Sequence, residues 1–242
     1  MAADGILPDI KTFSILLKMM PHDEDQEQCL IRTMDALDVA PDVGFFNQLM
    51  KKRASSRRNA AAKSAFRELE ARALQPDVAS FGCLAMTVRN GRDLASFWET
   101  LRAADVRPNV EMLTTLLNSA VRAADPQRAL AVMEAFIEHQ VAPERRVLLQ
   151  LEELRLNLRQ MTVAAERGRP PPRAAQQPSF ADSVRKFLLR YPRWLAEVHV
   201  ERERHPFRQY AVRPLAETVA AAGLSGAEEA PPQRRPSLPA DG

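Results

Sequence analysis

The chain repeats one short stretch four times, as Pro8-Asp9-Ile10-Lys11-Thr12-Phe13, Pro41-Asp42-Val43-Gly44-Phe45-Phe46, Pro76-Asp77-Val78-Ala79-Ser80-Phe81 and Pro108-Asn109-Val110-Glu111-Met112-Leu113. A fifth proline, Pro143, closes the series, and the successive spacings are 33, 35, 32 and 35 residues. A period of this length is typical of solenoids, in which every repeat is one supersecondary unit. The fold class therefore follows from the repeat rather than from any single element.

Each unit holds two runs of apolar residues at helical spacing, separated by a polar break. In the fourth unit these runs are Val110, Leu113, Leu116, Leu117 and Ala120, then Ala129, Val132, Met133 and Phe136. The Asp or Asn after each proline can accept hydrogen bonds from the free N–H groups that open the next helix. One helix pair cannot bury both of its apolar stripes, so we expect the units to stack into an all-α solenoid with a concave binding face.

The composition supports helices and excludes several other classes of protein. Among 242 residues, 45% are hydrophobic, 6% are aromatic and only eight are glycine, which disfavours a β-sandwich or barrel. No window approaches eighteen uninterrupted apolar residues, so a transmembrane helix is not expected. Cys29 and Cys83 lie far apart, so neither a disulfide framework nor a zinc site is indicated.

The charge is uneven along the chain. The net charge is +3, but residues 1–144 carry 17 basic and 20 acidic side chains, whereas residues 145–242 carry 17 basic and 11 acidic ones. The positive charge therefore belongs to the C-terminal part. Such a distribution permits contact with nucleic acid without proving it.

The pattern Pro-Asp-Val-x-x-Phe-x-x-Leu, followed by an apolar second helix, resembles the pentatricopeptide repeat family across residues 8–144. The Trp, Leu-Gly and Tyr of tetratricopeptide repeats are missing from all four units. The resemblance implies a right-handed α-solenoid that binds single-stranded RNA in an organelle, with one repeat addressing one nucleotide. Side chains spaced along a concave face can hydrogen-bond the exposed edges of unstacked bases one by one.

In that family two positions per repeat contact the base: the fifth residue of the first helix and the residue after the closing proline. The resemblance assigns these roles to Ser14 with Asp42, Asn47 with Asp77, Gly82 with Asn109, and Thr114 with Glu144. It implies guanine for the first pair and uracil for the second. The third pair fits adenine poorly, and the fourth departs from the usual code.

The same residues have a second interpretation that the sequence leaves open. Asp42, Asp77 and Asn109 can be helix caps alone. Asn47 is different, because it is a polar residue between the apolar Phe46 and Leu49 and is better explained by contact with a ligand.

Two groups of basic residues are further candidates for RNA contact. The first lies between the two helices of the second unit and either meets phosphates or forms a solvated loop; it comprises Lys51, Lys52, Arg53, Arg57, Arg58 and Lys63. The second combines cations with aromatic rings that can stack on bases; it comprises Arg185, Lys186, Arg190, Arg193 and Trp194. Alternatively, Trp194 and its neighbours pack against the solenoid or a partner protein.

These patterns divide the chain into successive parts. We expect the end of a preceding repeat at 1–9, four repeats within 10–144 (10–42, 43–77, 78–109 and 110–144), a capping helix at 145–167, a Pro-rich linker at 168–178, a basic aromatic helical segment at 179–214 and a disordered tail at 215–242. Because residues 1–9 look like the closing turn of a repeat, we expect the chain to be a fragment or short isoform of a longer array. The missing part is then expected to hold a mitochondrial transit peptide.

No catalytic constellation is apparent. The sequence has no Walker loop, no GxGxxG and no serine nucleophile elbow, and His199 and His205 are six apart and so do not share a helix face. We expect no metal, no cofactor and no enzymatic activity.

The expected function is RNA binding in the mitochondrial matrix, in tRNA processing or abundance or in rRNA handling. The expected partners are tRNA precursors and rRNA, with RNA-processing enzymes or the mitoribosome. The alternatives are a protein–protein scaffold and a mitoribosome-associated structural factor that does not read bases.

Overall fold

The computed structural model of the protein describes residues 8–166 and 179–198. All regular elements in these ranges are helices. In chain order they are α1 (Ile10–Met19), α2 (Glu24–Ala36), α3 (Val43–Ser55), α4 (Asn59–Ala71), α5 (Val78–Ala85), α6 (Gly91–Ala103), α7 (Val110–Arg122), α8 (Pro126–Glu138), α9 (Arg145–Glu166) and α10 (Phe180–Glu197). The linker expected at 168–178, residues 199–214 and the tail expected at 215–242 lie outside the described residues.

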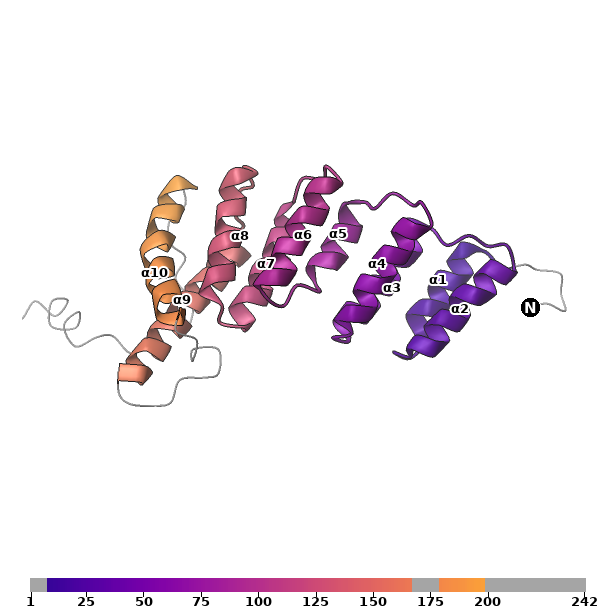
Figure 1. Ribbon diagram of the computed structural model, residues 1–242, viewed down its shortest axis with the longest axis horizontal. Coiled ribbons are helices and arrows are strands. Elements are labelled where there is room, and N and C mark those ends of the chain that lie inside the picture. Colours follow the sequence, from indigo (N-terminus) through magenta and orange to yellow (C-terminus); the bar gives the residue numbers. More distant parts are fainter. Residues whose placement is uncertain (1–7, 167–178, 199–242) are drawn as a thin grey trace, which may run out of the picture.

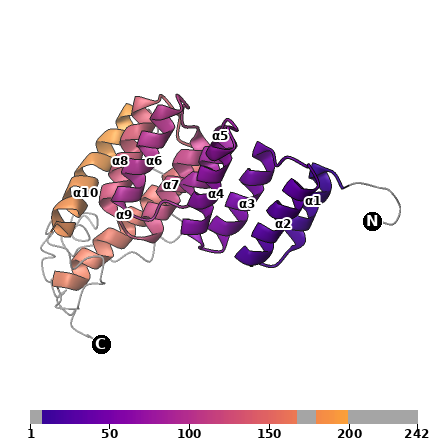
Figure 2. The ribbon, with the colours of Figure 1, turned by 45° about the vertical axis from the view of Figure 1, so that its right-hand side comes forward.

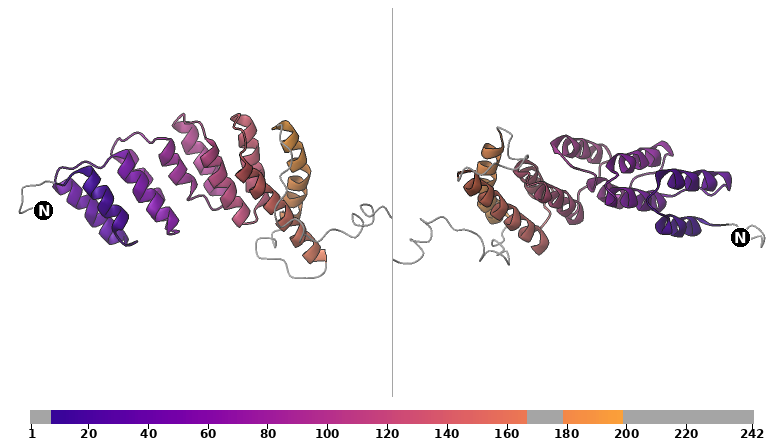
Figure 3. Two further views of the ribbon diagram at one scale, coloured as in Figure 1. Left: turned by 180° about the vertical axis from the view of Figure 1, so that it is seen from behind. Right: turned by 90° about the horizontal axis from the view of Figure 1, so that it is seen from below.

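The helices form an elongated row of pairs, with α1 and α10 at opposite ends (Figures 1 and 2). The first helices of successive units contact one another in the order α1, α3, α5, α7 and α9. In the second layer α8 contacts both α6 and α10, and the view from below displays the two layers (Figure 3). The predicted all-α solenoid is therefore confirmed.

Each first helix begins at the Asp or Asn that follows a proline. The side-chain Oδ1 of Asp9, Asp42, Asp77 and Asn109 accepts a hydrogen bond from the backbone N–H three residues on, at 2.8, 2.7, 2.7 and 2.9 Å. The four capping residues share an extended backbone, with φ between −99° and −102°. The repeated Pro-Asp pair is thus a repeated helix start.

Each second helix ends in the same way as well. Asp38, Ala73, Asp105 and Gln140 adopt left-handed backbone conformations with φ between 51° and 57°. The next residue then donates its N–H back to the helix, as Leu74 does to the carbonyl of Leu69 at 3.2 Å. This is a Schellman ending, whose apolar residue covers the last turn. The two signals together turn the chain back for the next pair.

The C-terminal part completes the stack rather than standing apart from it. The capping helix expected at 145–167 is α9, which packs on α7 where the first helix of a fifth pair would lie. After the undescribed linker, α10 packs on α8 in the second layer (Figure 1). The helices α9 and α10 therefore act as a fifth pair.

A buried ion cluster joins the first unit to the second. Glu27 on α2 is fully buried; its Oε2 lies 2.8 Å from Nε of Arg53, and its Oε1 lies 2.6 Å from Nη2 of Arg58. Burial raises the pKa of Glu27, but hydrogen bonds from Arg58 and Arg53 outweigh burial and hold the pKa below its ordinary value. The carboxylate is therefore ionised and holds two arginines at the repeat boundary.

Replacing Glu27 with glutamine should lower the free energy of unfolding by about 3–5 kcal/mol, because it leaves two cations at this boundary without their counter-charge. Asp35→Asn is the control: it breaks the exposed ion pair with Arg72 and should cost about 1 kcal/mol or less. Denaturant unfolding followed by circular dichroism measures both. Equal losses in the two variants would contradict the role assigned to Glu27.

The same cluster predicts a pH dependence. Because the folded-state pKa of Glu27 lies below its ordinary value, the cluster stabilises the fold fully above the ordinary glutamate pKa. This stabilisation is lost as the pH falls through the folded-state value. The difference in unfolding free energy between wild type and Glu27→Gln should therefore narrow on acidification.

Replacing Ala73 with glycine should raise the free energy of unfolding by about 1 kcal/mol, because an L-residue is strained at φ 57° and glycine is not. Ala95→Gly, at an exposed position inside α6, should instead lower it by about 1 kcal/mol. Unfolding midpoints measured side by side test the opposite signs. A stabilising effect at both positions would contradict the strain argument.

Candidate nucleic-acid interface

A groove of about 750 Å³ lies between the first-layer helices α3, α5 and α7. We call it the central groove; its lining includes Asn47, Asp77, Gly82, Asn109, Lys51, Val78, Met86, Met112 and Thr115. Four of the eight predicted base-contacting residues therefore meet in one groove. The other four, Ser14, Asp42, Thr114 and Glu144, do not line it.

Asn47 and Asp77 form a joined pair across two units. Nδ2 of Asn47 donates a hydrogen bond to Oδ1 of Asp77 at 3.0 Å. Burial raises the pKa of Asp77, but hydrogen bonds from Ser80 and Asn47 outweigh it and hold the pKa below its ordinary value. Asp77 is thus an ionised hydrogen-bond acceptor. It caps α5 and contacts Asn47 at the same time.

The other three predicted pairs differ from this one. Among the described residues no hydrogen bond joins Ser14 to Asp42, and Gly82 has no side chain to offer Asn109. Oγ1 of Thr114 donates to the carbonyl of Val110 at 2.6 Å and so is used by its own helix. Asp42 and Asn109 cap α3 and α7, as the alternative interpretation expected.

Sequence reasoning missed Ser80. This residue is fully buried near the start of α5, and its Oγ lies 2.7 Å from Oδ1 of Asn47, 33 positions earlier in the chain. A serine three residues after an Asp is an ordinary capping-box pattern. That pattern carries no sign of a contact with the preceding unit, so the sequence offered no signal for it.

The first basic group is largely used inside the protein. Arg53 and Arg58 bind Glu27 at the repeat boundary, and Arg53 is only 2% exposed. The expectation that these two arginines meet phosphates is therefore corrected, because their guanidinium groups already neutralise a buried carboxylate.

The same correction applies to two lysines of this group. Nζ of Lys52 donates to the carbonyls of Leu17 and Met20, both at 2.6 Å. Nζ of Lys63 lies 2.6 Å from Oδ1 of Asp93. Of the six predicted cations, Lys51 and Arg57 remain exposed.

A second groove, of about 570 Å³, lies at the opposite ends of the same first-layer helices. No carboxylate is among its lining residues, and it shares Met86 and Thr115 with the central groove. Three exposed cations, one at each of three successive turns, line it: Arg57, Arg89 and Arg122. We call these three residues the arginine edge. Arg89 and Arg122 stand singly in the sequence, which is why the basic-cluster argument did not find them.

The second predicted group, on α10, is also divided by the structure. Trp194 is fully buried, packs edge-on against Phe136 with ring centroids 6.0 Å apart, and donates its indole N–H to the carbonyl of Met133 at 2.7 Å. The structure agrees with the alternative that Trp194 packs against the solenoid: its ring and its N–H both contact α8, so neither is available to RNA bases.

Arg190 is likewise engaged within the protein. Its guanidinium lies 2.7 Å from Glu134 and 2.6 Å from Glu197, and these carboxylates raise its pKa further above the ordinary arginine value. Arg185, Lys186 and Arg193 are exposed on the same helix. They are the part of this group that remains available for a ligand.

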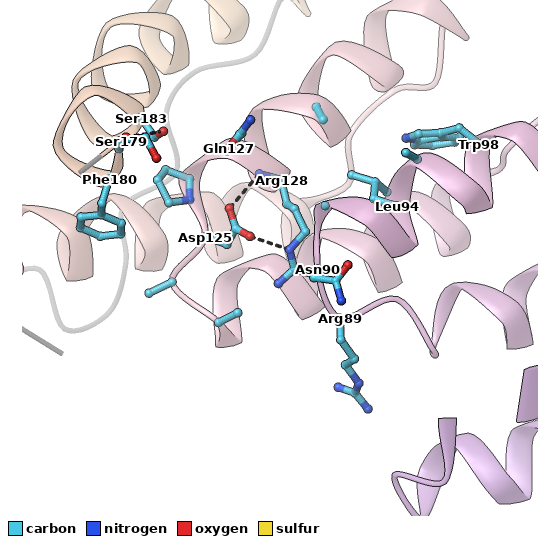
Figure 4. Close-up of a pocket in the computed structure, with 16 residues that line it drawn as sticks. Arg89, Asn90, Leu94, Trp98, Asp125, Gln127, Arg128, Ser179, Phe180 and Ser183 are labelled. Atoms are coloured by element: carbon cyan, nitrogen blue, oxygen red, sulfur yellow. Dashed lines mark hydrogen bonds and ion pairs between the residues drawn. The ribbon is translucent and has the colours of Figure 1, made fainter. Parts of the chain in front are cut away.

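A further pocket, of about 550 Å³, lies where the N-termini of α6, α8 and α10 converge (Figure 4). Three of its polar residues have structural uses: Asn90 caps α6, and Asp125 caps α8 and lies 2.8 Å from Nε of Arg128. Trp98 and Phe180 supply apolar walls.

The described residues offer neither a metal cluster nor a membrane helix. No group of three or more His, Cys, Asp or Glu within these residues is arranged to hold a metal ion. His199 and His205 lie outside them. Among the described helices, none combines the length and the hydropathy needed to cross a bilayer.

Comparison with known proteins agrees with this architecture. Residues 97–147 match the model of the pentatricopeptide repeat domain. The chain is 25% identical over 215 residues to the mouse mitochondrial pentatricopeptide repeat-containing protein 1, covering 89% of this chain and 30% of that protein. For the human protein of the same name the figures are 23% over 207 residues, 86% and 28%. The chain thus spans about three-tenths of the length of these relatives.

Two solved structures share the fold. One is the pentatricopeptide repeat domain of Arabidopsis thaliana protein-only RNase P 1 in complex with tRNA, with a TM-score of 0.52 and 16% identity over 87% of this chain and 96% of that one. The other is the maize pentatricopeptide repeat protein PPR10, with a TM-score of 0.50 and 16% identity over 78% of this chain and 30% of that one. The predicted resemblance is therefore confirmed: residues 97–147 match the pentatricopeptide repeat domain, and the chain is similar to pentatricopeptide repeat proteins in sequence and in fold.

Proposed function

We propose that this chain binds single-stranded RNA along its first-layer face, with bases in the central groove and phosphates along the arginine edge. The observation that carries the proposal is the continuity of the two grooves through Met86 and Thr115. One groove offers hydrogen-bonding groups at the spacing of the repeats, and the other offers cations without carboxylates. A single strand presents the same two chemistries side by side.

The central groove suits the bases. Asn47 and Asp77 offer a donor and an acceptor, while Val78, 45% exposed, and the partly buried Met86 add apolar surface beside them. Flat bases bury their faces on apolar surface and satisfy their edges with polar groups. A groove of mixed character therefore favours bases over a purely ionic ligand.

The arginine edge suits the phosphates. Arg57, Arg89 and Arg122 are exposed and recur once per unit, so they can follow a strand that advances one nucleotide per unit. Each phosphate contact releases counterions, which makes the affinity depend on salt. Arg185, Lys186 and Arg193 of α10 are exposed in the second layer and form a separate candidate contact with RNA.

We further propose that the RNA is mitochondrial and that the chain acts by binding rather than by catalysis. Relatives matched over most of this chain are named mitochondrial proteins, and a tRNA occupies one structure of the same fold. These facts support a role in the matrix on tRNA precursors or rRNA, in tRNA processing or abundance or in rRNA handling. RNA-processing enzymes or the mitoribosome would then be the protein partners.

Replacing Arg57, Arg89 and Arg122 together with glutamine should weaken binding of a short random-sequence RNA pool without changing which sequences are preferred. The plot of log affinity against log salt should become shallower by about two, because each neutralised phosphate contributes about 0.7 to the slope for a single strand. Fluorescence anisotropy over a range of salt concentrations measures it. The matched control replaces Arg32, Arg67 and Arg102, which are exposed on α2, α4 and α6 of the second layer. An equal effect of the two triple variants would remove the arginine edge from the proposal.

Replacing Asn47 with alanine should erase the base preference at one position of the bound RNA and lower affinity about threefold to tenfold, the range of one hydrogen bond. Selection from a random RNA pool, followed by sequencing, measures the preference. Gln48→Ala is the control, because Gln48 lines the same groove but is not part of the joined pair. If the wild-type protein enriches no RNA sequence and its affinity for RNA does not depend on salt, the proposed function is overturned. The central groove would then be better explained as a binding site for a peptide.

A further inference from the structure

Five hydrogen-bond contacts link Ser80, Asn47 and Asp77 to one another, and the two in which the Ser80 hydroxyl is the donor share its one proton. The backbone N–H of Ser80 donates to Oδ1 of Asp77 at 2.7 Å, and the backbone N–H of Asp77 donates to Oγ of Ser80 at 3.2 Å. The Ser80 Oγ lies 2.7 Å from Oδ1 of Asn47, and Nδ2 of Asn47 lies 3.0 Å from Oδ1 of Asp77. These bonds close a ring that spans the boundary between two units.

The chemistry of the ring determines which atom of the Asn47 amide points where. The ionised Asp77 can only accept, so the amide nitrogen must face it and the amide oxygen must face Ser80. Ser80 has a single hydroxyl proton, within reach of both Asn47 Oδ1 and Asp77 Oδ1. Asp77 Oδ1 already accepts hydrogen bonds from two N–H groups, so the Ser80 hydroxyl donates its proton preferentially to Oδ1 of Asn47.

What remains for a ligand is one N–H of Asn47 and Oδ2 of Asp77. Apart from the backbone N–H of Ala79, which also acts on the Asp77 carboxylate, no hydrogen bond among the described residues engages either of them. Uracil and cytosine differ at two adjacent edge atoms, where donor and acceptor are interchanged. A site can tell these bases apart only if its own donor and acceptor stay in place. When Ser80 is present, hydrogen bonds to Ser80 and to Asp77 hold both the oxygen and the nitrogen of the Asn47 amide. When only Asp77 holds it, the amide has a single hydrogen bond and can rotate.

This arrangement is confined to one of the described pairs. Ser80 stands three residues after Asp77; the corresponding residue is Phe45 after Asp42, Met112 after Asn109 and Val147 after Glu144, and none of these has a hydroxyl to donate. Thr12 holds the corresponding place in the first unit, where its hydroxyl bonds the cap residue Asp9 at 2.8 Å. Base selectivity should therefore be concentrated at the nucleotide that faces Asn47 and Asp77.

We propose that Ser80 is a positioning residue that holds the Asn47 amide in one orientation and so allows the Asn47–Asp77 pair to distinguish uracil from cytosine. The proposal rests on the proposed function, because it concerns an RNA base in the central groove. Ser80 itself is buried and does not touch the base. Its effect should appear in selectivity rather than in the strength of binding.

The test measures the ratio of uracil to cytosine enrichment at the position read by the pair, with the full chain and a random single-stranded RNA pool. Ser80→Ala should reduce this ratio about threefold to tenfold, the worth of one neutral hydrogen bond. Because the ratio comes from the folded molecules in one sample, a loss of folded protein does not change it. Thr12→Ala removes the matching hydroxyl of the first unit and should leave the ratio at its wild-type value.

A double-mutant cycle separates positioning from general stability. In the Asn47→Ala background, Ser80→Ala should have no further effect on the ratio, because the amide it positions is gone. A second measurement needs no RNA: the side-chain amide of Asn47 should become more mobile in Ser80→Ala by nitrogen-15 relaxation. A Ser80→Ala protein that keeps the wild-type ratio, or an equally rigid amide, would overturn this inference alone. A wild-type protein that binds no RNA would remove the proposed function as well.

Discussion

The fold depends on the hydrogen bond between each post-proline Asp or Asn and the backbone N–H three residues later. Four such bonds, between 2.7 and 2.9 Å, start α1, α3, α5 and α7 with nearly identical backbone angles. The Schellman ending before each proline sets where the previous helix stops. Because the same junction recurs, every pair leaves it in a similar direction and the pairs stack into a row.

The same junction positions the groups that face the groove. Asp77 uses Oδ1 for the cap and for Asn47, which leaves Oδ2 for a ligand. A helix start is therefore also a binding position, and a substitution at Asp77 affects both stability and binding. Asn47 separates these two roles, because its side chain does not cap the helix, whereas the Ser80 hydroxyl also closes the capping box at the start of α5.

The sequence was most informative about the repeated helix pairs and least informative about which charged side chains form ion pairs with one another. The helix pairs and their caps follow from periodicity and from residues close in the chain, whereas the Asn47–Asp77 pairing was implied by the resemblance to the pentatricopeptide repeat family. Arg53, Arg58 and Lys63 looked like free cations, yet their carboxylate partners come from neighbouring units 26 to 31 residues away. The sequence left open whether Trp194 stacks on bases or packs within the protein, because its partner Phe136 is distant in the chain. The arginine edge was found only in part, because Arg57 belongs to the predicted basic group whereas Arg89 and Arg122 stand alone in the sequence and join it only in space.

The sequence by itself determined the helices, the repeat and the place of each junction, because helix period, proline and capping chemistry act over a few residues. Only the tertiary structure decided which polar side chains remain available to a ligand. Stacking of the helix pairs brings together residues that are about one repeat apart in the sequence. A buried charge is then neutralised by an opposite charge on the neighbouring unit, which the local sequence does not reveal. Ser80 illustrates both levels: a local cap in the sequence, and a contact with the preceding unit in the fold.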